Sequence, residues 1–313
     1  MTLLTLLILA GCARVSSEWT KLQENIPSQI RLDVPFYPQE KYQCGPAVMS
    51  MLLEHTGKHV SPETLRPIIY TPSKKGSLQS AMVAGARRYD RIPYVFYGPE
   101  TLLKELENGR PAGVLLNLGL KSAPYWHYAV VTGADFNNDK MILHSGTVKN
   151  STMRMATFEH TWRRADYWGL FVLSPNDIPE TADPIKYVQT VSAFEKMGRF
   201  DITKTAYSKA YERWKDNLFV ILGLANAYYA EKDLDAAKEL LAKATRLHPK
   251  SAEAQNNYAY LLFVTGEAEK ALLHAEKAVK IGGSNTELYK ETLDEIKSAL
   301  SLTNQETLQR SGH

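Results

Sequence analysis

The sequence is poor in cysteine, in net charge and in the motifs that bind metals or nucleotides. Only two cysteines occur among 313 residues, and no Cys or His cluster has zinc spacing, so we expect no metal and no other cofactor. The net charge is +3 and no run of five basic residues is present, which argues against nucleic-acid binding. The phosphate-loop pattern G-x-x-x-x-G-K followed by Ser or Thr is also missing, so ATP is not an expected ligand.

Residues 1–12 form a segment that we expect to be processed rather than folded. Leu3 to Ala10 is apolar but too short to span a bilayer. The stretch ends in Leu9-Ala10-Gly11-Cys12, which resembles the lipobox of bacterial lipoproteins, and this resemblance makes Cys12 the lipidation site. An ordinary secretory signal or a short anchor is the alternative. Because Ala13 rather than Asp follows, the resemblance implies a lipid-anchored protein of the bacterial cell envelope, at the outer membrane and facing the periplasm.

Residues 31–173 have the pattern of an α+β domain, preceded by a polar tether over 13–30. Helical patterns dominate the first half of this domain and strand patterns the second, which is typical of an α+β fold. We predict helices at 47–55, from Ser61 onward, at 77–89 and at 100–108, and strands at 32–36, 92–96, 112–117, 125–132, 140–144 and 167–173. Three prolines and three acidic residues over 174–184 predict a linker.

From 185 to 300 the sequence repeats with a period of 34 residues. Three sets of residues show this spacing: Ala210, Ala244 and Ala278; Phe194, Tyr228 and Leu262; and Gly198, Lys232 and Gly266. This is the period of the tetratricopeptide repeat, a helix pair in which small residues allow close approach. We therefore predict an all-α repeat region that ends in a capping helix at 286–300, with a polar tail at 301–313. Such repeats mostly bind a partner protein, and a purely structural role is the alternative.

Cys44 has the sequence context of a nucleophile. With Cys12 assigned to the lipid, Cys44 has no partner for an intramolecular disulfide. It precedes Gly45-Pro46 and a helical run, and proline favours the first turn of a helix. The thiol should therefore lie at the positive end of a helix dipole, which would lower its pKa.

Two further residues complete a candidate catalytic group. His127 begins a strand pattern, so its ring can face a cleft while the strand body packs, and it is the best candidate for a general base. His144 is the alternative base, and His127 as a core histidine is the other possibility. Gln39 lies just before Cys44, where its side-chain amide could donate to an oxyanion together with the backbone N–H of Cys44.

Gln39, Cys44-Gly45-Pro46 and the run from His127 to Gly133 resemble the papain-like C39 peptidases. More narrowly, the chain resembles the C39-like lipoproteins that carry tetratricopeptide repeats. The resemblance covers most of 31–173 together with the repeats. It implies a cysteine peptidase in which Cys44 is the nucleophile, His127 the general base and Gln39 the oxyanion donor. The related bacteriocin-processing members cut after a double glycine in a leader peptide.

The acid that orients the histidine in this family has no clear counterpart here. It is expected on the strand after His127, which reads Met-Ile-Leu-His-Ser-Gly over 141–146. His144 or Ser145 on that strand, or Asn117 on the neighbouring strand, are the candidates to orient His127. We expect a Cys–His peptidase that acts on a peptide or protein substrate. Two alternatives are a non-catalytic peptide-binding or assembly lipoprotein on the same fold, and a Cys-dependent acyltransferase or amidase.

Overall fold

The computed structural model describes residues 19, 21–22, 26–39 and 42–311, with side chains as far as residue 302. The chain divides into two compact units, 1–174 with 179–181, and 175–178 with 182–313. Residues 174–183 contain no helix or strand. The predicted signal segment, its Cys12 and most of the predicted tether lie outside the described residues.

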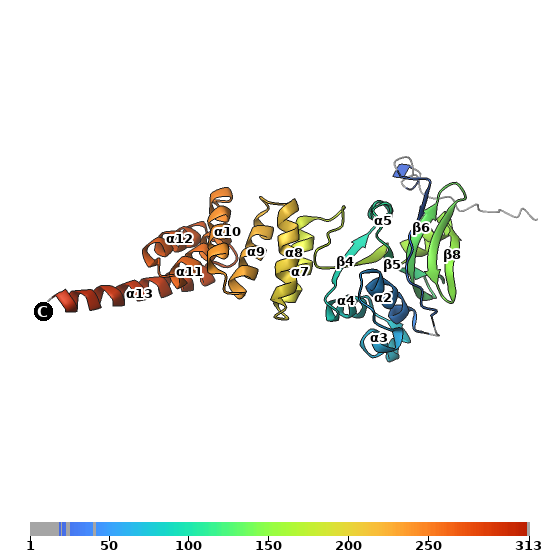
Figure 1. The fold of residues 1–313 in the computed structure, drawn as a ribbon, viewed down its shortest axis with the longest axis horizontal. Coiled ribbons are helices and arrows are strands. Elements are labelled where there is room, and N and C mark those ends of the chain that lie inside the picture. Colours follow the sequence, from blue (N-terminus) through green and yellow to red (C-terminus); the bar gives the residue numbers. More distant parts are fainter. Residues whose placement is uncertain (1–18, 20, 23–25, 40–41, 312–313) are drawn as a thin grey trace, which may run out of the picture. The chain divides into compact units, whose positions relative to one another are not determined.

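The first unit is built on a seven-stranded antiparallel sheet (Figure 1). Its strands are β1 (Gln29–Arg31), β4 (Ile92–Tyr97), β5 (Ala112–Asn117), β6 (Trp126–Asp135), β7 (Lys140–Ser145), β8 (Val148–Arg154) and β9 (Trp168–Leu173). They lie in the order β4-β9-β5-β6-β7-β8, and β1 pairs with the far end of β6. Strand β5 is buried along its whole length, as expected for a central strand that packs on both faces.

Helices of the same unit pack against this sheet or against one another. They are α2 (Cys44–His55), α3 (Pro62–Ile69), α4 (Gln79–Arg88), α5 (Pro99–Glu107) and α6 (Met155–Arg163). Helix α2 is buried from Gly45 to Leu53, and its apolar side chains share one core with Tyr128 and Val130 of β6. A short ribbon of β2 (Tyr70–Thr71) and β3 (Gly76–Ser77), joined by the 3₁₀ turn η1 (Pro72–Lys74), lies between α3 and α4. The deep burial of α2 fixes the position of its first residue, Cys44.

Two predictions at the start of this unit are wrong. The strand expected at 32–36 lies at 29–31 instead, and its ladder ends with the bond from the Leu32 N–H to the Thr132 carbonyl, 2.8 Å long. Pro35 has no N–H to continue the ladder. The predicted tether also contains folded parts, because its last residues belong to β1 and Trp19 is fully buried with its ring 6.1 Å from that of Phe158.

The second unit consists of three helix pairs and a last single helix. The pairs are α7 (Pro184–Glu195) with α8 (Phe200–Arg213), α9 (Leu218–Ala230) with α10 (Leu234–Leu247), and α11 (Ala252–Val264) with α12 (Ala268–Ile281). Ala210, Ala244 and Ala278 have no exposed surface, which explains why the 34-residue period keeps a small residue there. Gly198, Lys232 and Gly266 all have positive φ in the turn inside each pair.

The last helix, α13 (Thr286–Ser311), is longer than predicted. Residues 301–311 continue the capping helix and do not form a separate non-helical tail. No glycine or proline occurs between Thr286 and Ser311, so nothing in the sequence stops the helix before Gly312.

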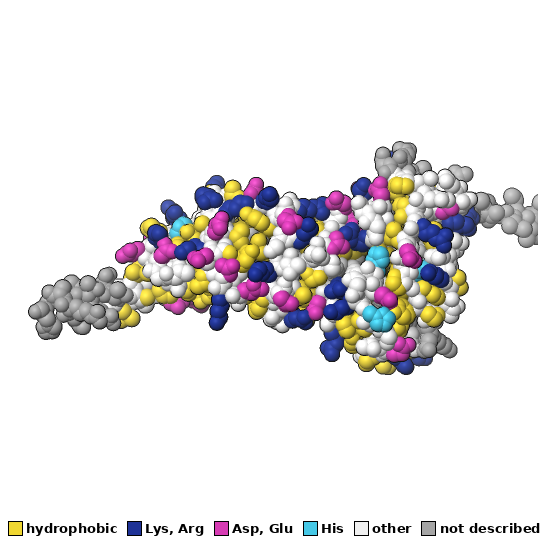
Figure 2. All heavy atoms as spheres, viewed as in Figure 1, with side chains coloured by type: hydrophobic (Ala, Val, Ile, Leu, Met, Phe, Trp, Pro, Cys, Tyr) yellow, Lys and Arg dark blue, Asp and Glu magenta, His cyan; other side chains and the backbone are white. Residues whose placement is uncertain are grey.

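Acidic and basic side chains are interspersed on the face of the repeats seen in Figure 2. In the part of the chain that the structure describes, no helix has the length and apolarity needed to cross a membrane.

Candidate active site

Cys44 is the first residue of helix α2, as the sequence predicts. Pro46 stands in the first turn of the helix, where its missing N–H costs no hydrogen bond. Tyr42, two residues before the thiol, has a φ of 66°, a left-handed conformation that is uncommon for a non-glycine residue. The chain thus turns sharply before the helix and presents the partly exposed thiol at its N-terminal end.

Gly45 allows the ribbon of β2 and β3 to approach the nucleophile. A Cβ at this position would lie 2.2 Å from Ser77 Oγ and 2.5 Å from Ser77 Cβ. No real Cβ contact is that short, so the glycine next to Cys44 is required by close packing. The helix start and the ribbon therefore hold each other in place.

His127 lies at the start of β6, opposite Leu116 of β5. Its Nε2 is 2.9 Å from Ser145 Oγ on β7. If the hydroxyl oxygen accepts the Nε2 proton, the neutral ring keeps Nδ1 free to take a proton from another group. Of the three candidates to orient His127, Ser145 is the one that makes this contact.

The other two candidates make different hydrogen bonds. His144 is fully buried, with Nε2 3.0 Å from the Val34 carbonyl and Nδ1 accepting from the Asn150 N–H at 3.2 Å. Both ring nitrogens of His144 are therefore hydrogen-bonded inside the core. His144 is then not available as the base or as the residue that orients His127. Asn117 accepts the backbone N–H groups of Gly119 and Tyr125, each at 3.0 Å, and so shapes the loop that leads to His127.

Gln39 is held firmly beside the same strand ends. Its backbone N–H donates to the Gly146 carbonyl at 2.9 Å, and the Gly146 N–H donates back to Gln39 Oε1 at 3.1 Å. Its Nε2 donates to the Tyr128 carbonyl at 3.3 Å, which uses one of the two amide protons. The second amide proton makes no hydrogen bond among the described residues.

Cys44, His127 and Gln39 line one cavity of about 830 Å³. Its wall includes side chains that the sequence did not single out: Tyr42, Lys74, Lys75, Ser77, Leu78, Tyr125 and Trp126. Tyr125 and Trp126 are 64% and 51% exposed, large values for aromatic side chains. A volume in this range suits a peptide segment of a few residues rather than a small ion.

Burial sets the protonation of the candidate pair. Desolvation raises the pKa of the Cys44 thiol above its ordinary value, although the backbone N–H groups of Tyr128, Gly45 and Cys44 partly oppose this. Desolvation also lowers the pKa of His127. The thiol pKa is thus raised overall and not lowered as the sequence predicts, because burial outweighs the favourable backbone groups at the helix start. Near neutral pH the resting pair is a thiol and a neutral imidazole.

The comparisons with known proteins concern the two parts of the chain. Residues 31–169 match the model of the Peptidase_C39 like family, and residues 222–286 match a tetratricopeptide repeat. The chain combines a C39-like domain with tetratricopeptide repeats. The predicted fold class, an α+β peptidase-type domain followed by an all-α repeat domain, is confirmed. No curated protein matches the chain.

Solved structures of both kinds resemble parts of the chain. A putative C39-like peptidase from Bacillus anthracis is 16% identical, with 47% of this chain and 98% of that chain covered and a TM-score of 0.41. The peptidase domain of Streptococcus ComA, a bi-functional ABC transporter, is 23% identical, with 44% and 97% covered and a TM-score of 0.37. The Sgt2 repeat domain from Aspergillus fumigatus is 22% identical, with 40% and 83% covered and a TM-score of 0.37.

The wall of the C39-like cavity could be found only in part from the sequence. Trp126 directly precedes His127, so an exposed aromatic at the strand start was a usable signal. Lys74 and Lys75 lie in the turn that joins the two-residue strands of the ribbon, and strands that short have no periodicity to detect. Among the described residues, no cluster of His, Cys, Asp or Glu could hold a metal ion.

Proposed function

We propose that the protein is a cysteine peptidase that is lipid-anchored through Cys12 and recruits a substrate or partner protein through its repeats. The observation that carries this proposal is that Cys44, His127 and Gln39 line one cavity in a C39-like domain. The hydrogen bond between His127 Nε2 and Ser145 Oγ supports the role of His127 as base, because it holds the ring and, with Nε2 as the donor, leaves Nδ1 free to take a proton.

The reaction would begin from the neutral pair. His127 Nδ1 takes the proton from the Cys44 thiol as the sulfur attacks the carbonyl carbon of the scissile bond. The oxyanion that forms accepts hydrogen bonds from Gln39 Nε2 and the Cys44 backbone N–H. The intermediate collapses as His127 gives its proton to the leaving amine, which leaves a thioester on Cys44. Water then attacks the thioester with His127 again as base, releasing the acid and restoring the thiol.

Labelling of Cys44 by an electrophilic peptide probe, followed by mass spectrometry, tests this function. Cys44→Ala should abolish labelling, and His127→Ala should slow it by about 10²- to 10⁴-fold, the usual contribution of a general base. His59→Ala is a matched control, because this histidine of the same domain is 77% exposed. Equal labelling of the wild type and the Cys44→Ala variant would remove Cys44 from the mechanism.

A second candidate is a non-catalytic peptide-binding lipoprotein on the same fold. Two observations favour it: the raised pKa of the Cys44 thiol, and the serine that contacts His127 where an acid is usual in this family. It predicts that probe peptides bind the cavity without labelling Cys44. If labelling occurs, product analysis with added amines separates hydrolysis from acyl transfer.

The proposed anchor has its own test. Cys12→Ser should move the protein from the membrane fraction to the soluble fraction and remove the lipid mass from the N-terminal peptide. An unmodified Cys12 in membrane-bound wild-type protein would exclude lipidation as the means of attachment.

A further inference from the structure

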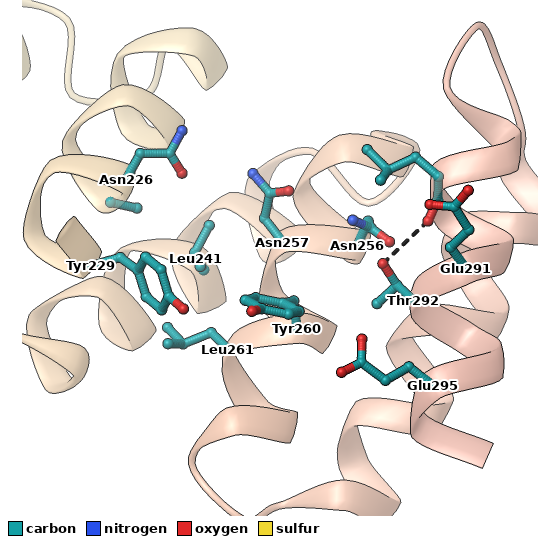
Figure 3. A pocket seen from close by; sticks show the side chains of 12 residues that line it. Asn226, Tyr229, Leu241, Asn256, Asn257, Tyr260, Leu261, Glu291, Thr292 and Glu295 are labelled. Atoms are coloured by element: carbon teal, nitrogen blue, oxygen red, sulfur yellow. Dashed lines mark hydrogen bonds between the residues drawn. The ribbon is translucent and has the colours of Figure 1, made fainter. Parts of the chain in front are cut away.

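A second cavity, of about 430 Å³, lies within the repeats. Figure 3 shows side chains of α9, α11 and α13 converging on it. Four residues make the apolar part of its wall, namely Ala225, Leu241, Leu261 and Leu288, and the other lining residues are polar or aromatic. We call this cavity the repeat groove.

The acidic part of the repeat groove is on α13. Glu291 and Glu295 lie one helical turn apart and are both exposed (Figure 3). Neither makes an ion pair or hydrogen bond within the described part of the chain, whereas Glu287 on the same helix is paired with Lys290 at 2.8 Å. No Lys or Arg occurs among the described residues that line the groove. Two uncompensated carboxylates therefore face the same space.

Asn256 adds a buried acceptor to this acidic part. Only 6% of its surface is exposed, and its Oδ1 is buried with no hydrogen-bond partner among the described residues. A buried acceptor without a partner costs about 1–3 kcal/mol, so such a group usually awaits a donor. The hydroxyl of neighbouring Thr292 cannot serve, because it donates to the Leu288 carbonyl at 3.2 Å. Asn256 Oδ1 can therefore accept a hydrogen bond from a water or from a molecule bound in the groove.

Two tyrosines form the other end of the repeat groove. Tyr229 of α9 and Tyr260 of α11 are 39% and 38% exposed, and their rings meet edge to face with centroids 6.1 Å apart. Aromatic faces attract the head groups of Arg and Lys as well as their apolar stems. The groove thus combines acceptors, negative charge and aromatic rings, and all three favour a cationic side chain.

We infer that the repeat groove binds an extended peptide segment carrying lysine or arginine side chains. A guanidinium or ammonium group can donate an N–H hydrogen bond to Asn256 Oδ1, and its positive charge can pair with the carboxylates of Glu291 and Glu295. This inference deepens the proposed function, since it rests on partner recruitment by the repeats and specifies the chemistry of the recruited segment. It does not depend on catalysis by Cys44.

Calorimetric titration of the full chain with three synthetic peptides tests the inference. The peptides are acetylated and amidated Ala-Ser-Ala-X-Ala-X-Ala-Ser-Ala, in which X is Arg, norleucine or Glu. We expect the Arg peptide to bind at least about tenfold more tightly than the Glu peptide, with a difference that shrinks as salt is added. Glu291→Gln/Glu295→Gln should remove most of this preference. Asn256→Leu should weaken the binding of the Arg peptide and leave the binding of the other two peptides unchanged.

A matched double variant controls for net charge. Glu239→Gln/Glu269→Gln also removes two exposed carboxylates from the repeats, but neither residue lines the groove, so it should keep the Arg preference. Equal affinity for the Arg and Glu peptides, or an equal loss of the Arg preference in both double variants, would overturn the charge inference. Recruitment of a partner by the repeats would still stand. Failure of all three peptides to bind would overturn recruitment by this groove as well. Labelling of Cys44 would be unaffected in either case.

Discussion

Alanine at position 45 tests how the C39-like domain holds its thiol. The new Cβ would lie 2.2 Å from Ser77 Oγ, 2.5 Å from Ser77 Cβ and 3.3 Å from Ile69 Cγ2. Either the ribbon or the first turn of α2 must move, and Cys44 moves with that turn. We therefore expect Gly45→Ala to lower both the stability of the domain and the rate of probe labelling at Cys44.

Two opposing effects set the magnitude. Overpacking a tight site costs about 1–3 kcal/mol, whereas replacing glycine by alanine in a helix gains at most about 1 kcal/mol. Gly45→Ala should then lower the free energy of unfolding by about 1–2 kcal/mol. Ser77→Gly removes the two atoms that collide, so in that background the same substitution should be close to neutral or slightly stabilising.

Urea unfolding of the four proteins measures this double-mutant cycle, with the transition of the first unit followed separately from that of the repeats. Ser77→Ala is the matched control, because it removes the hydroxyl but keeps the Cβ that Gly45→Ala would meet at 2.5 Å. A coupling energy under about 0.5 kcal/mol, or an equal rescue by Ser77→Ala, would refute the reasoning.

Three further predictions follow from the same domain. Ser145→Ala should slow probe labelling up to about tenfold, since a neutral hydrogen bond contributes about 0.5–1.5 kcal/mol, and Ser145→Thr should restore it; unchanged labelling would dismiss Ser145 as the residue that positions His127. Because the pKa of the Cys44 thiol is raised and thiolate is the reactive form, iodoacetamide should react slowly near neutral pH and faster as the pH rises past about 8.5; a rate that levels off below neutral pH would contradict this. Glu105 is fully buried, forms an ion pair with Arg110 and accepts two hydrogen bonds of 2.7 Å from the Thr181 N–H and hydroxyl, so Glu105→Ala should cost about 3–5 kcal/mol in urea unfolding. As a control, Glu107→Ala removes a paired surface carboxylate from the same helix and should lower the free energy of unfolding by under about 1 kcal/mol. Equal losses in the two variants would show that the buried pair has no special role.

The parts of the fold that follow a strong local pattern could be predicted from the sequence. The 34-residue period gave the helix pairs, and Ser61 before Pro62 marked the start of α3, where the Ser61 hydroxyl accepts the Thr64 N–H. Strand β8 was missed because most of its residues are polar and none is buried. The helix α6 that follows was also missed, although Met155, Phe158 and Trp162 have helical spacing.

The candidate site was predictable as far as its motifs, and no further. Cys44 and His127 were found from their local context. The local sequence did not show which of His144, Ser145 and Asn117 contacts His127. The strand pairing of β7 with β8 is irregular between Leu143 and Ser145, so simple alternation of side chains does not apply there. The direction of the Cys44 pKa shift was also out of reach, because burial by distant segments is not visible in the local sequence.

The burial of Cys44 has a consequence for damage by oxidants. Peroxides attack the thiolate, and oxidation beyond sulfenic acid is largely irreversible. A thiol that stays protonated near neutral pH offers little of this target, so we expect peroxide to oxidise Cys44 slowly in the resting protein. In the proposed reaction thiolate forms only as His127 removes the proton of Cys44. Oxidation of this sulfur would then be limited to the time during which the cavity carries out the reaction.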